Sequence, residues 1–264
     1  MKADPASQWY VISLRPRGEH ATMRRAAARH GAGVIALSPW VLVPREDADT
    51  RRELHAALCA SRVVFTSPAA VRAARRLRVL EGLPLVPPTL GAAPQWYGVG
   101  AGTASALRRA GAGFAQSPAR MDSEGVLALP ALLDVDGRDV GLVTAPGGRD
   151  ALEPALRARG ARVLRADVYT REPARLSTRA LAALRGTQAP CVVAVSSAGA
   201  LEQVLDRAPD AIGTLLRGLP LVAASERLAA HARALGFARV CVAPGPQPDV
   251  LVAAARAQAS GSMR

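Results

Sequence analysis

Hydroxyl groups, arginines and small residues recur where strands are expected to end and helices to begin. These candidate binding positions are Arg15, Thr66, Ser67, Gly100, Thr103, Gly148, Arg149, Ser196, Ser197 and Ser225. Free backbone N–H groups at a helix start, hydroxyls and guanidinium groups all bind carboxylate or phosphate oxygens. One such position alone is more often an ordinary helix cap. Because six such segments recur along the chain, the sequence predicts an anion-binding protein.

Tyr169 is the best candidate for acid–base chemistry in this chain. It directly follows an expected strand over residues 162–168 and precedes a polar segment that ends at Pro173. A phenol beside a bound ligand could donate a proton or a hydrogen bond to a departing hydroxyl group. Tyr169 could equally be a packing residue at a hinge, and the sequence leaves both roles open. We predict Tyr169 as the catalytic residue, with the packing role as the alternative.

The histidines and cysteines do not form a recognisable site. The histidines are His20, His30, His55 and His231. They lie far apart without the spacing of metal ligands, and they are predicted on helix surfaces, so we expect no metal site. The cysteines are Cys59, Cys191 and Cys241. Their odd number and wide separation favour a reduced, cytoplasmic chain without disulfides.

Known cofactor motifs are absent or incomplete. The segment 98–103 resembles a dinucleotide-binding turn, but Thr103 stands where the third glycine is required. No acidic residue follows at a strand end about 20 residues later, where it would bind a ribose. The nucleophile elbow and the phosphate-binding loop are also missing. The sequence therefore predicts no cofactor.

The charge of the chain is strongly positive, with 34 Lys and Arg against 21 Asp and Glu and a net charge of +13. This balance favours a polyanionic ligand, although an arginine-rich solvated surface explains it equally well. A nucleic-acid partner is disfavoured, because aromatic residues make up only 3% of the chain and no recognition motif is present. The chain shows no signal peptide and no apolar run long enough to span a membrane, so we expect no membrane partner.

Strands and helices alternate along the chain, which is typical of parallel sheets built from βαβ units. Ser67, Ser123 and the pair Ser196-Ser197 are expected to cap the helices that follow them. The pattern of residues 63–67 recurs at 192–196, and the pattern of 100–111 recurs at 225–236. The sequence therefore predicts two similar halves.

Two extended segments bounded by prolines, residues 39–44 and 167–173, are predicted as linker strands. The chain would leave one domain, build a second and return. The predicted domains are a discontinuous α/β domain of residues 1–38 plus 174–264 and a second α/β domain of residues 45–166. The predicted fold class is therefore α/β, with two similar parallel-sheet domains joined by a two-stranded linker. A ligand is expected in the cleft between the two domains.

The ordered set of motifs resembles the uroporphyrinogen-III synthase family over roughly residues 9–257. The matching motifs are Arg15-Pro16, Phe65-Thr66-Ser67-Pro68, Val99-Gly100 with Thr103-Ala104 and Gly111, Gly147-Gly148-Arg149 with Leu156 and Gly160, Val168-Tyr169, Ser196-Ser197-Ala198-Gly199, and a final Ala/Leu helix closing at Gly236. No single motif is specific, but their order and spacing are.

The resemblance implies a monomeric, cofactor-free cyclising lyase of haem biosynthesis. Its substrate would be hydroxymethylbilane, which closes to uroporphyrinogen III with inversion of ring D and loss of water. Tyr169 matches the family's tyrosine, which would assist departure of the hydroxyl group. Ser67, Thr103, Ser196 and Ser197 match positions that hold carboxylate arms. A transient contact with the preceding or following pathway enzyme is a further expectation. The alternative is a non-catalytic two-domain α/β protein that binds a polyanionic ligand.

Overall fold

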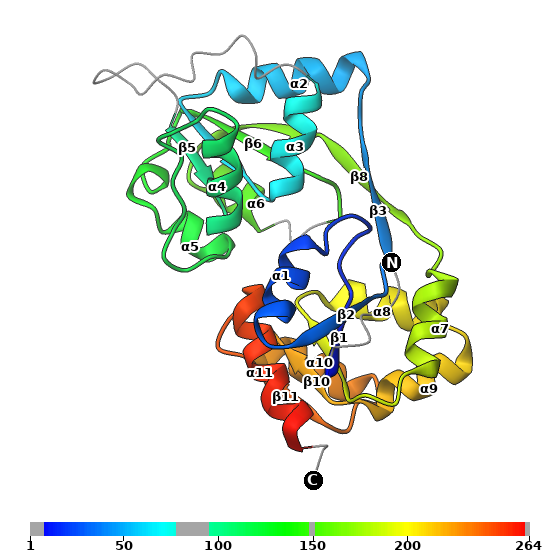
Figure 1. Ribbon diagram of the computed structural model, residues 1–264. Helices are drawn as coiled ribbons and strands as arrows, with labels where there is room; N and C mark the ends of the chain where they lie inside the picture. The colour runs from blue at the N-terminus through cyan, green and yellow to red at the C-terminus, as the bar shows by residue number, and fades with distance from the viewer. Residues whose placement is uncertain (1–7, 78–94, 148–150, 262–264) are drawn as a thin grey trace. The chain divides into compact units, whose positions relative to one another are not determined.

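The computed structural model describes residues 8–77, 95–147 and 151–261. The chain divides into two compact units (Figure 1). Unit 1 consists of Met1–Val41 and Glu172–Arg264, and unit 2 consists of Leu42–Arg171. The chain therefore passes from unit 1 to unit 2 within the expected first linker segment and returns within the second.

Unit 1 is built on a parallel sheet with the strand order β11-β10-β9-β1-β2. Its strands are β1 (Trp9–Ser13), β2 (Ala32–Ala36), β9 (Cys191–Val195), β10 (Leu221–Ala223) and β11 (Val240–Val242). Strand β1 pairs with β2 on one side and with β9 on the other, so strands from the two ends of the chain meet at the centre of this sheet. Every residue of β1 is buried, as expected for a parallel strand covered on both faces.

Helices cover both faces of the unit 1 sheet. They are α1 (Ala21–Arg29), α7 (Thr178–Gly186), α8 (Ala198–Arg207), α9 (Asp210–Gly218), α10 (Glu226–Ala234) and α11 (Pro248–Gly261). Trp9 and Val11 pack with α1 and α11, whereas Tyr10 and Ile12 pack with the other four helices. The alternation follows from the period of two residues along a strand. Helix α9 was not among the elements predicted from the sequence.

Unit 2 repeats this construction with the strand order β5-β4-β6-β7. Its strands are β4 (Arg62–Phe65), β5 (Gln95–Gly98), β6 (Asp139–Thr144) and β7 (Arg162–Asp167). Its helices are α2 (Ala48–Leu58), α3 (Pro68–Arg76), α4 (Ala101–Arg109), α5 (Ser123–Leu127), the 3-10 helix η2 (Pro130–Leu132) and α6 (Leu152–Ala158). Val63 and Phe65 face α2, α3 and α4, and Val64 faces α5, η2 and α6.

Two strands, β3 (Trp40–Pro44) and β8 (Tyr169–Pro173), pair with each other where the chain passes between the units. The pairing is extended at one end by a hydrogen bond from Arg45 N–H to the Val168 carbonyl (3.0 Å) and at the other by one from Ala174 N–H to the Pro39 carbonyl (2.9 Å). The two strands therefore run in opposite directions. Parallel α/β sheets and a two-stranded linker confirm the predicted fold class.

Serine caps position several helices of both units, and one predicted cap is wrong. Ser67, Ser197 and Ser225 accept hydrogen bonds from backbone N–H groups three residues later, at 3.1, 3.4 and 3.4 Å. Ser123 is instead the first residue of α5, and Asp122 caps that helix by accepting from Gly125 N–H at 2.8 Å. A carboxylate at this position also interacts favourably with the positive end of the helix dipole, which explains the preference for Asp122.

Candidate functional site

The first cluster of candidate residues lies in unit 2 and centres on Ser67 and Tyr169. The Ser67 hydroxyl, which follows β4, accepts the N–H of Ala70 and lies 3.1 Å from the Tyr169 hydroxyl. Because one lone pair of the Ser67 oxygen is already engaged, the serine can donate its proton to the phenol or accept the phenol's proton through its second lone pair. Tyr169 is only 4% exposed, and its ring belongs to the hydrophobic core of this unit. The structure thus brings together two predicted site residues that are 102 positions apart.

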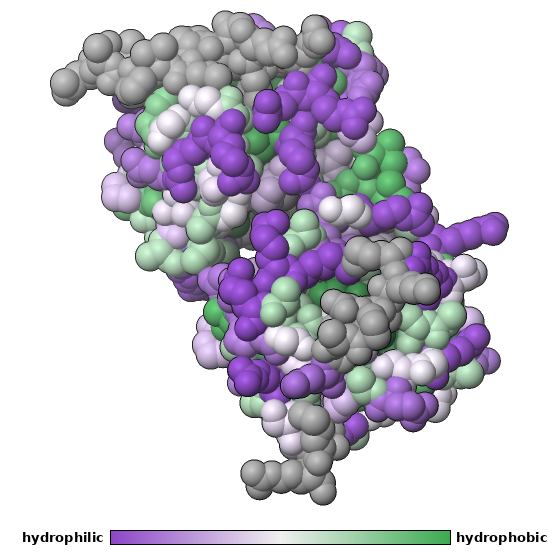
Figure 2. Space-filling view, viewed as in Figure 1, coloured by the Kyte–Doolittle hydropathy of each residue, from purple (hydrophilic) through white to green (hydrophobic). Residues whose placement is uncertain are grey.

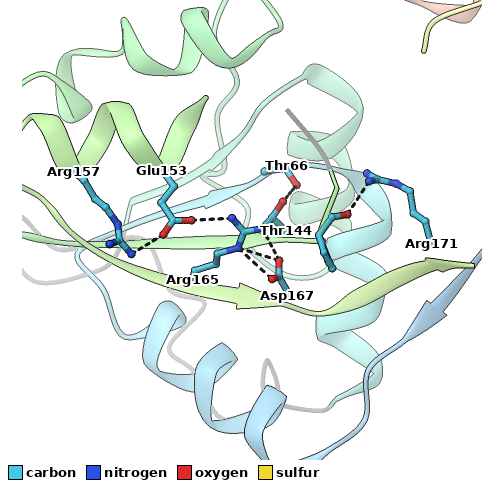
Figure 3. A network of polar contacts seen from close by, with 8 residues as sticks. Thr66, Thr144, Glu153, Arg157, Arg165, Asp167 and Arg171 are labelled. Atoms are coloured by element: carbon cyan, nitrogen blue, oxygen red, sulfur yellow. Dashed lines mark hydrogen bonds and ion pairs between the residues drawn. The ribbon is translucent and has the colours of Figure 1, made fainter. Parts of the chain in front are cut away.

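Arg171 places a positive charge beside the Tyr169 ring. Its guanidinium carbon lies 5.9 Å from the ring centroid, within the range of a cation–π contact. Its Nη1, at the end of the side chain labelled in Figure 3, donates to the carbonyl of Pro146 at 3.1 Å. Pro146 opens the turn that leads toward Gly148 and Arg149, two predicted binding residues that lie outside the described residues. Sequence reasoning did not single out Arg171, although its position two residues after Tyr169 on β8 was available as a signal.

Thr66 directly follows β4 and makes a contact that the sequence did not predict. Its hydroxyl donates to the hydroxyl of Thr144 at the end of β6 (2.9 Å), and its backbone N–H donates to the Val143 carbonyl. The two threonines point toward each other in Figure 3. The carboxyl ends of β4 and β6 therefore present paired hydroxyls at the edge of the sheet, where ligands of parallel α/β proteins gather.

An ion network lies beside these threonines (Figure 3). Arg165 Nη1 donates to Glu153 at 2.8 Å, and Arg165 Nε donates to Asp167 at 3.1 Å. Arg157 binds the other oxygen of Glu153 at 2.6 Å. Since two carboxylates hold Arg165, this arginine is not available for a ligand anion. The sequence offered one signal for the contact between Arg165 and Asp167: the two residues are two positions apart on β7, so they lie on the same face of the strand.

Gly100 and Thr103 belong to the start of α4, which follows β5. Gly100 is the N-cap residue and its carbonyl accepts the N–H of Thr103 at 2.9 Å. The Ala101 N–H points to the thioether sulfur of Met121 at 3.4 Å, which is a weak acceptor, so this helix start retains capacity for an anion. Thr103 is 3% exposed and lies deeper than Gly100. The helix starts this close to β5 because Gly98 has no side chain: a Cβ there would lie 2.5 Å from the Ala104 nitrogen.

Unit 1 carries the remaining candidates at the carboxyl edge of its own sheet. Arg15 follows β1, Ser196 and Ser197 follow β9, and Ser225 follows β10. These three strands are neighbours, so their carboxyl ends lie side by side. Ser196 is exposed, whereas the hydroxyls of Ser197 and Ser225 are engaged as helix caps.

Arg15 is the one strongly cationic candidate in this group. Its Nε is buried without a hydrogen-bond partner, and in the described part of the chain no ion pair involves it. Burial lowers the pKa of Arg15, and the nearby charge of Glu19 opposes this effect. A half-buried guanidinium whose Nε makes no hydrogen bond is poised to bind an anion, because the anion would satisfy an otherwise costly buried donor.

His20 corrects the prediction that the histidines lie on helix surfaces. It is 6% exposed, with Nδ1 2.9 Å from the Ser13 hydroxyl and Nε2 2.8 Å from the Ser38 hydroxyl. Burial, followed by the charges of Arg24 and Arg15, lowers the pKa of His20 to about 4. His20 is the N-cap residue that precedes α1, so it is not part of the helix surface. Among the described residues, no cluster of three or more His, Cys, Asp or Glu side chains has a geometry suited to a metal ion.

The fold and these clusters define a class: a protein of two parallel α/β units whose strand ends and helix starts offer hydroxyl, amide and guanidinium groups to an anion. Comparison with known proteins is more specific. The family model of uroporphyrinogen-III synthase (HemD) matches residues 21–253, so this chain belongs to the uroporphyrinogen-III synthase family. The uroporphyrinogen-III synthase of Salmonella typhimurium is 32% identical over 165 residues, which are 61% of this chain and 67% of that protein.

Solved structures of low sequence identity share the fold of this chain. A mutant uroporphyrinogen III synthase of Thermus thermophilus aligns over 96% of this chain and 99% of its own, with a TM-score of 0.58 and 20% identity. The uroporphyrinogen-III synthetase of Helicobacter pylori aligns over 97% and 100%, with a TM-score of 0.56 and 16% identity. The family resemblance seen in the sequence is confirmed, and the chain is placed among the enzymes of tetrapyrrole biosynthesis. None of the described helices combines the length and apolar character needed to span a membrane.

Proposed function

We propose that this chain is a cyclising lyase that converts hydroxymethylbilane to uroporphyrinogen III, with inversion of ring D and release of one water molecule. The observation that carries the proposal is the hydrogen bond between Tyr169 and Ser67 at the edge of the unit 2 sheet. It supports the proposal because the phenol is an O–H donor that lies beside hydroxyl and amide groups, which are able to bind carboxylates.

The reaction requires proton transfer and carbon–carbon bond formation but no net oxidation. The C–O bond of the hydroxymethyl group breaks as its oxygen receives a proton, and water leaves. The resulting cation is attacked by the ring D carbon that already carries the bridge to ring C, which gives a spiro intermediate. The older bond from that carbon to the bridge then breaks, the released bridge carbon bonds to the unsubstituted carbon of ring D, and that carbon loses a proton. Because electrons balance within the substrate, the proposal needs no cofactor. We assign the proton donated to the leaving oxygen to Tyr169, whose hydroxyl is held by Ser67.

The carboxylate arms of the substrate are proposed to bind the anion-binding positions of both units. In unit 2 these are Thr66, Ser67, Gly100, Thr103, Gly148 and Arg149. In unit 1 these are Arg15, Ser196, Ser197 and Ser225. The net charge of +13 favours capture of such a polyanion. Hydrophilic side chains lie over α3 and α4 in Figure 2, and exposed arginines contribute to them. The arginines are Arg72, Arg75, Arg76, Arg108 and Arg109.

We further propose that the chain acts in the cytoplasm as a monomer, in transient contact with the preceding or following enzyme of the pathway. Free thiols at Cys59, Cys191 and Cys241 are compatible with a reducing compartment.

The direct test is incubation of the purified chain with freshly generated hydroxymethylbilane, followed by chromatographic separation of the oxidised products. Isomer III is the expected product. The symmetric isomer I forms without a catalyst, so isomer I alone, at the rate of a protein-free control, would refute the proposal and favour a non-catalytic binding protein. The Tyr169→Phe variant, run beside the wild type, separates ligand binding from turnover.

A further inference from the structure

The loop between β1 and α1 is hydrogen-bonded to residues at the unit 1 ends of the two linker strands. This β1–α1 loop comprises residues 14–20 and carries Arg15. The backbone N–H of Arg17 donates to the carbonyl of Trp40, the first residue of β3, at 2.8 Å. The Arg17 guanidinium donates to the carbonyl of Arg175, which follows β8, at 3.3 Å. The third fastening is His20, which contacts Ser38 just before β3.

His20 is the member of this set that no proposed step of the reaction uses. Its ring bridges Ser13, the last residue of β1, and Ser38, with heavy-atom distances of 2.9 and 2.8 Å. A neutral imidazole has one donor nitrogen and one acceptor nitrogen, and each serine hydroxyl can fill either role. The charged groups acting on the ring are Arg24 and Arg15, and both lower the pKa of His20, as burial does. The ring is therefore a neutral bridge at pH 7.

Arg15 lies two residues after Ser13, one of the two serines that the His20 ring joins. The Nε atom of Arg15 is buried and makes no hydrogen bond. No hydrogen bond at Nε therefore fixes the position of the guanidinium. The loop that carries Arg15 is held at its beginning by β1 and at its end by His20. The turn between them closes with a hydrogen bond from Glu19 N–H to the Pro16 carbonyl (2.9 Å).

We propose that His20 is a positioning residue for substrate binding: by joining Ser13 to Ser38 it holds the β1–α1 loop so that Arg15 is preset to bind a carboxylate arm. This proposal rests on the function proposed above. Histidine suits the task because one neutral ring can donate and accept at opposite sides. A lysine or arginine at this position would add a cation beside Arg15 and Arg24 and, because neither side chain has an acceptor atom, could accept no hydrogen bond from either serine.

The test compares His20→Phe, which keeps a planar ring but makes no hydrogen bond, with His20→Gln, which retains one donor and one acceptor. His30→Phe is the matched control, because His30 lies at the other end of α1 and its Nδ1 has no hydrogen-bond partner. We expect His20→Phe to raise KM for hydroxymethylbilane about tenfold, which corresponds to the loss of one to two hydrogen bonds. The value of kcat should stay within about threefold, since an effect on positioning acts on binding. His20→Gln should recover most of the loss in KM, and His30→Phe should match the wild type.

Hydrogen exchange gives a readout that does not depend on activity. In His20→Phe the amide of Arg17 should exchange faster than in His30→Phe, because the loop is released from Trp40. An unchanged KM together with unchanged exchange would overturn the proposal, as would an equal loss in kcat that His20→Gln fails to recover. If His20→Phe does not fold, Ser38→Ala removes one contact of the bridge, and a wild-type KM in that variant would overturn the proposal. If the wild type forms no isomer III, the proposed function fails. The role of His20 in holding the loop is tested separately, because an unchanged exchange rate of the Arg17 amide in His20→Phe would refute it.

Discussion

Replacing Tyr169 by phenylalanine removes one oxygen atom and leaves the buried ring in place. The structural loss is a single neutral hydrogen bond of 3.1 Å to Ser67, which still caps α3 through Ala70. Such a bond contributes about 0.5–1.5 kcal/mol to the free energy of unfolding. Loss of a proton donor slows a reaction by about 100- to 10,000-fold. That corresponds to about 3–5 kcal/mol in activation free energy. The two roles of Tyr169 therefore predict clearly different outcomes.

Tyr97→Phe provides a matched control within the same unit. Tyr97 lies on β5, is 6% exposed, and its hydroxyl donates to Gln95 at 2.8 Å. We expect the two variants to lose similar stability in urea unfolding. Only Tyr169→Phe should lose the rate of isomer III formation at saturating hydroxymethylbilane. If its rate stays within about threefold of the Tyr97→Phe rate, a factor too small for a lost proton donor, Tyr169 is a packing residue and the assignment of the proton is wrong.

Four further outcomes follow from the structure. Gly98→Ala should cost about 1–3 kcal/mol in urea unfolding, because the new methyl group would meet Ala104 N at 2.5 Å; wild-type stability would contradict the close approach of α4. Phe65→Ala should cost about 3–5 kcal/mol in the same assay, since Phe65 is fully buried and its ring lies 5.6 Å from that of Trp96; a loss below about 1 kcal/mol would contradict this packing. The pKa of His20 falls from 6.5 to about 4 on folding, so the unfolded chain takes up a proton that the folded chain does not. The contribution of His20 to the free energy of unfolding is constant above pH 6.5 and is lost as the pH falls from 6.5 toward 4, by up to about 3 kcal/mol. The His20→Gln variant should lack this part of the acid-induced loss of stability. Identical profiles of stability against pH for the variant and the wild type would refute the lowered pKa of His20. Alkylation at neutral pH, mapped by mass spectrometry, should modify Cys59 before Cys191, because Cys59 is exposed and burial raises the pKa of Cys191 to about 11; the reverse order would contradict the burial.

The parts of the site that follow from local chemistry could be predicted from the sequence. Ser67 and Pro68 after an apolar strand define a capped helix, and the structure has that cap. The alternation of strands and helices defines parallel sheets, and the repeated pattern defines two units. These features depend on neighbours in the chain, so the sequence displays them directly.

Features that depend on distant partners could not be predicted in this way. His20 looked like a helix-surface residue, because nothing near it in the sequence shows that Ser38 will lie 2.8 Å away. The contact of Arg165 with Glu153 depends on how α6 packs against β7, which periodicity does not specify. Helix α9, which follows α8, was also missed.

The placement of both chain ends in unit 1 sets the order in which the protein can fold during synthesis. Unit 2 is continuous from Leu42 to Arg171, so all of its strands are synthesised before β9. Strands β1 and β2 are synthesised before unit 2. Strand β1 pairs with β9, which follows it only after more than half of the chain. The inserted unit can therefore fold while the opening strands still lack their partner, and the outer unit closes only when the last third of the polypeptide emerges. A nascent chain stalled when Arg171 has just emerged from the ribosome would carry a folded insert on an unpaired N-terminal segment.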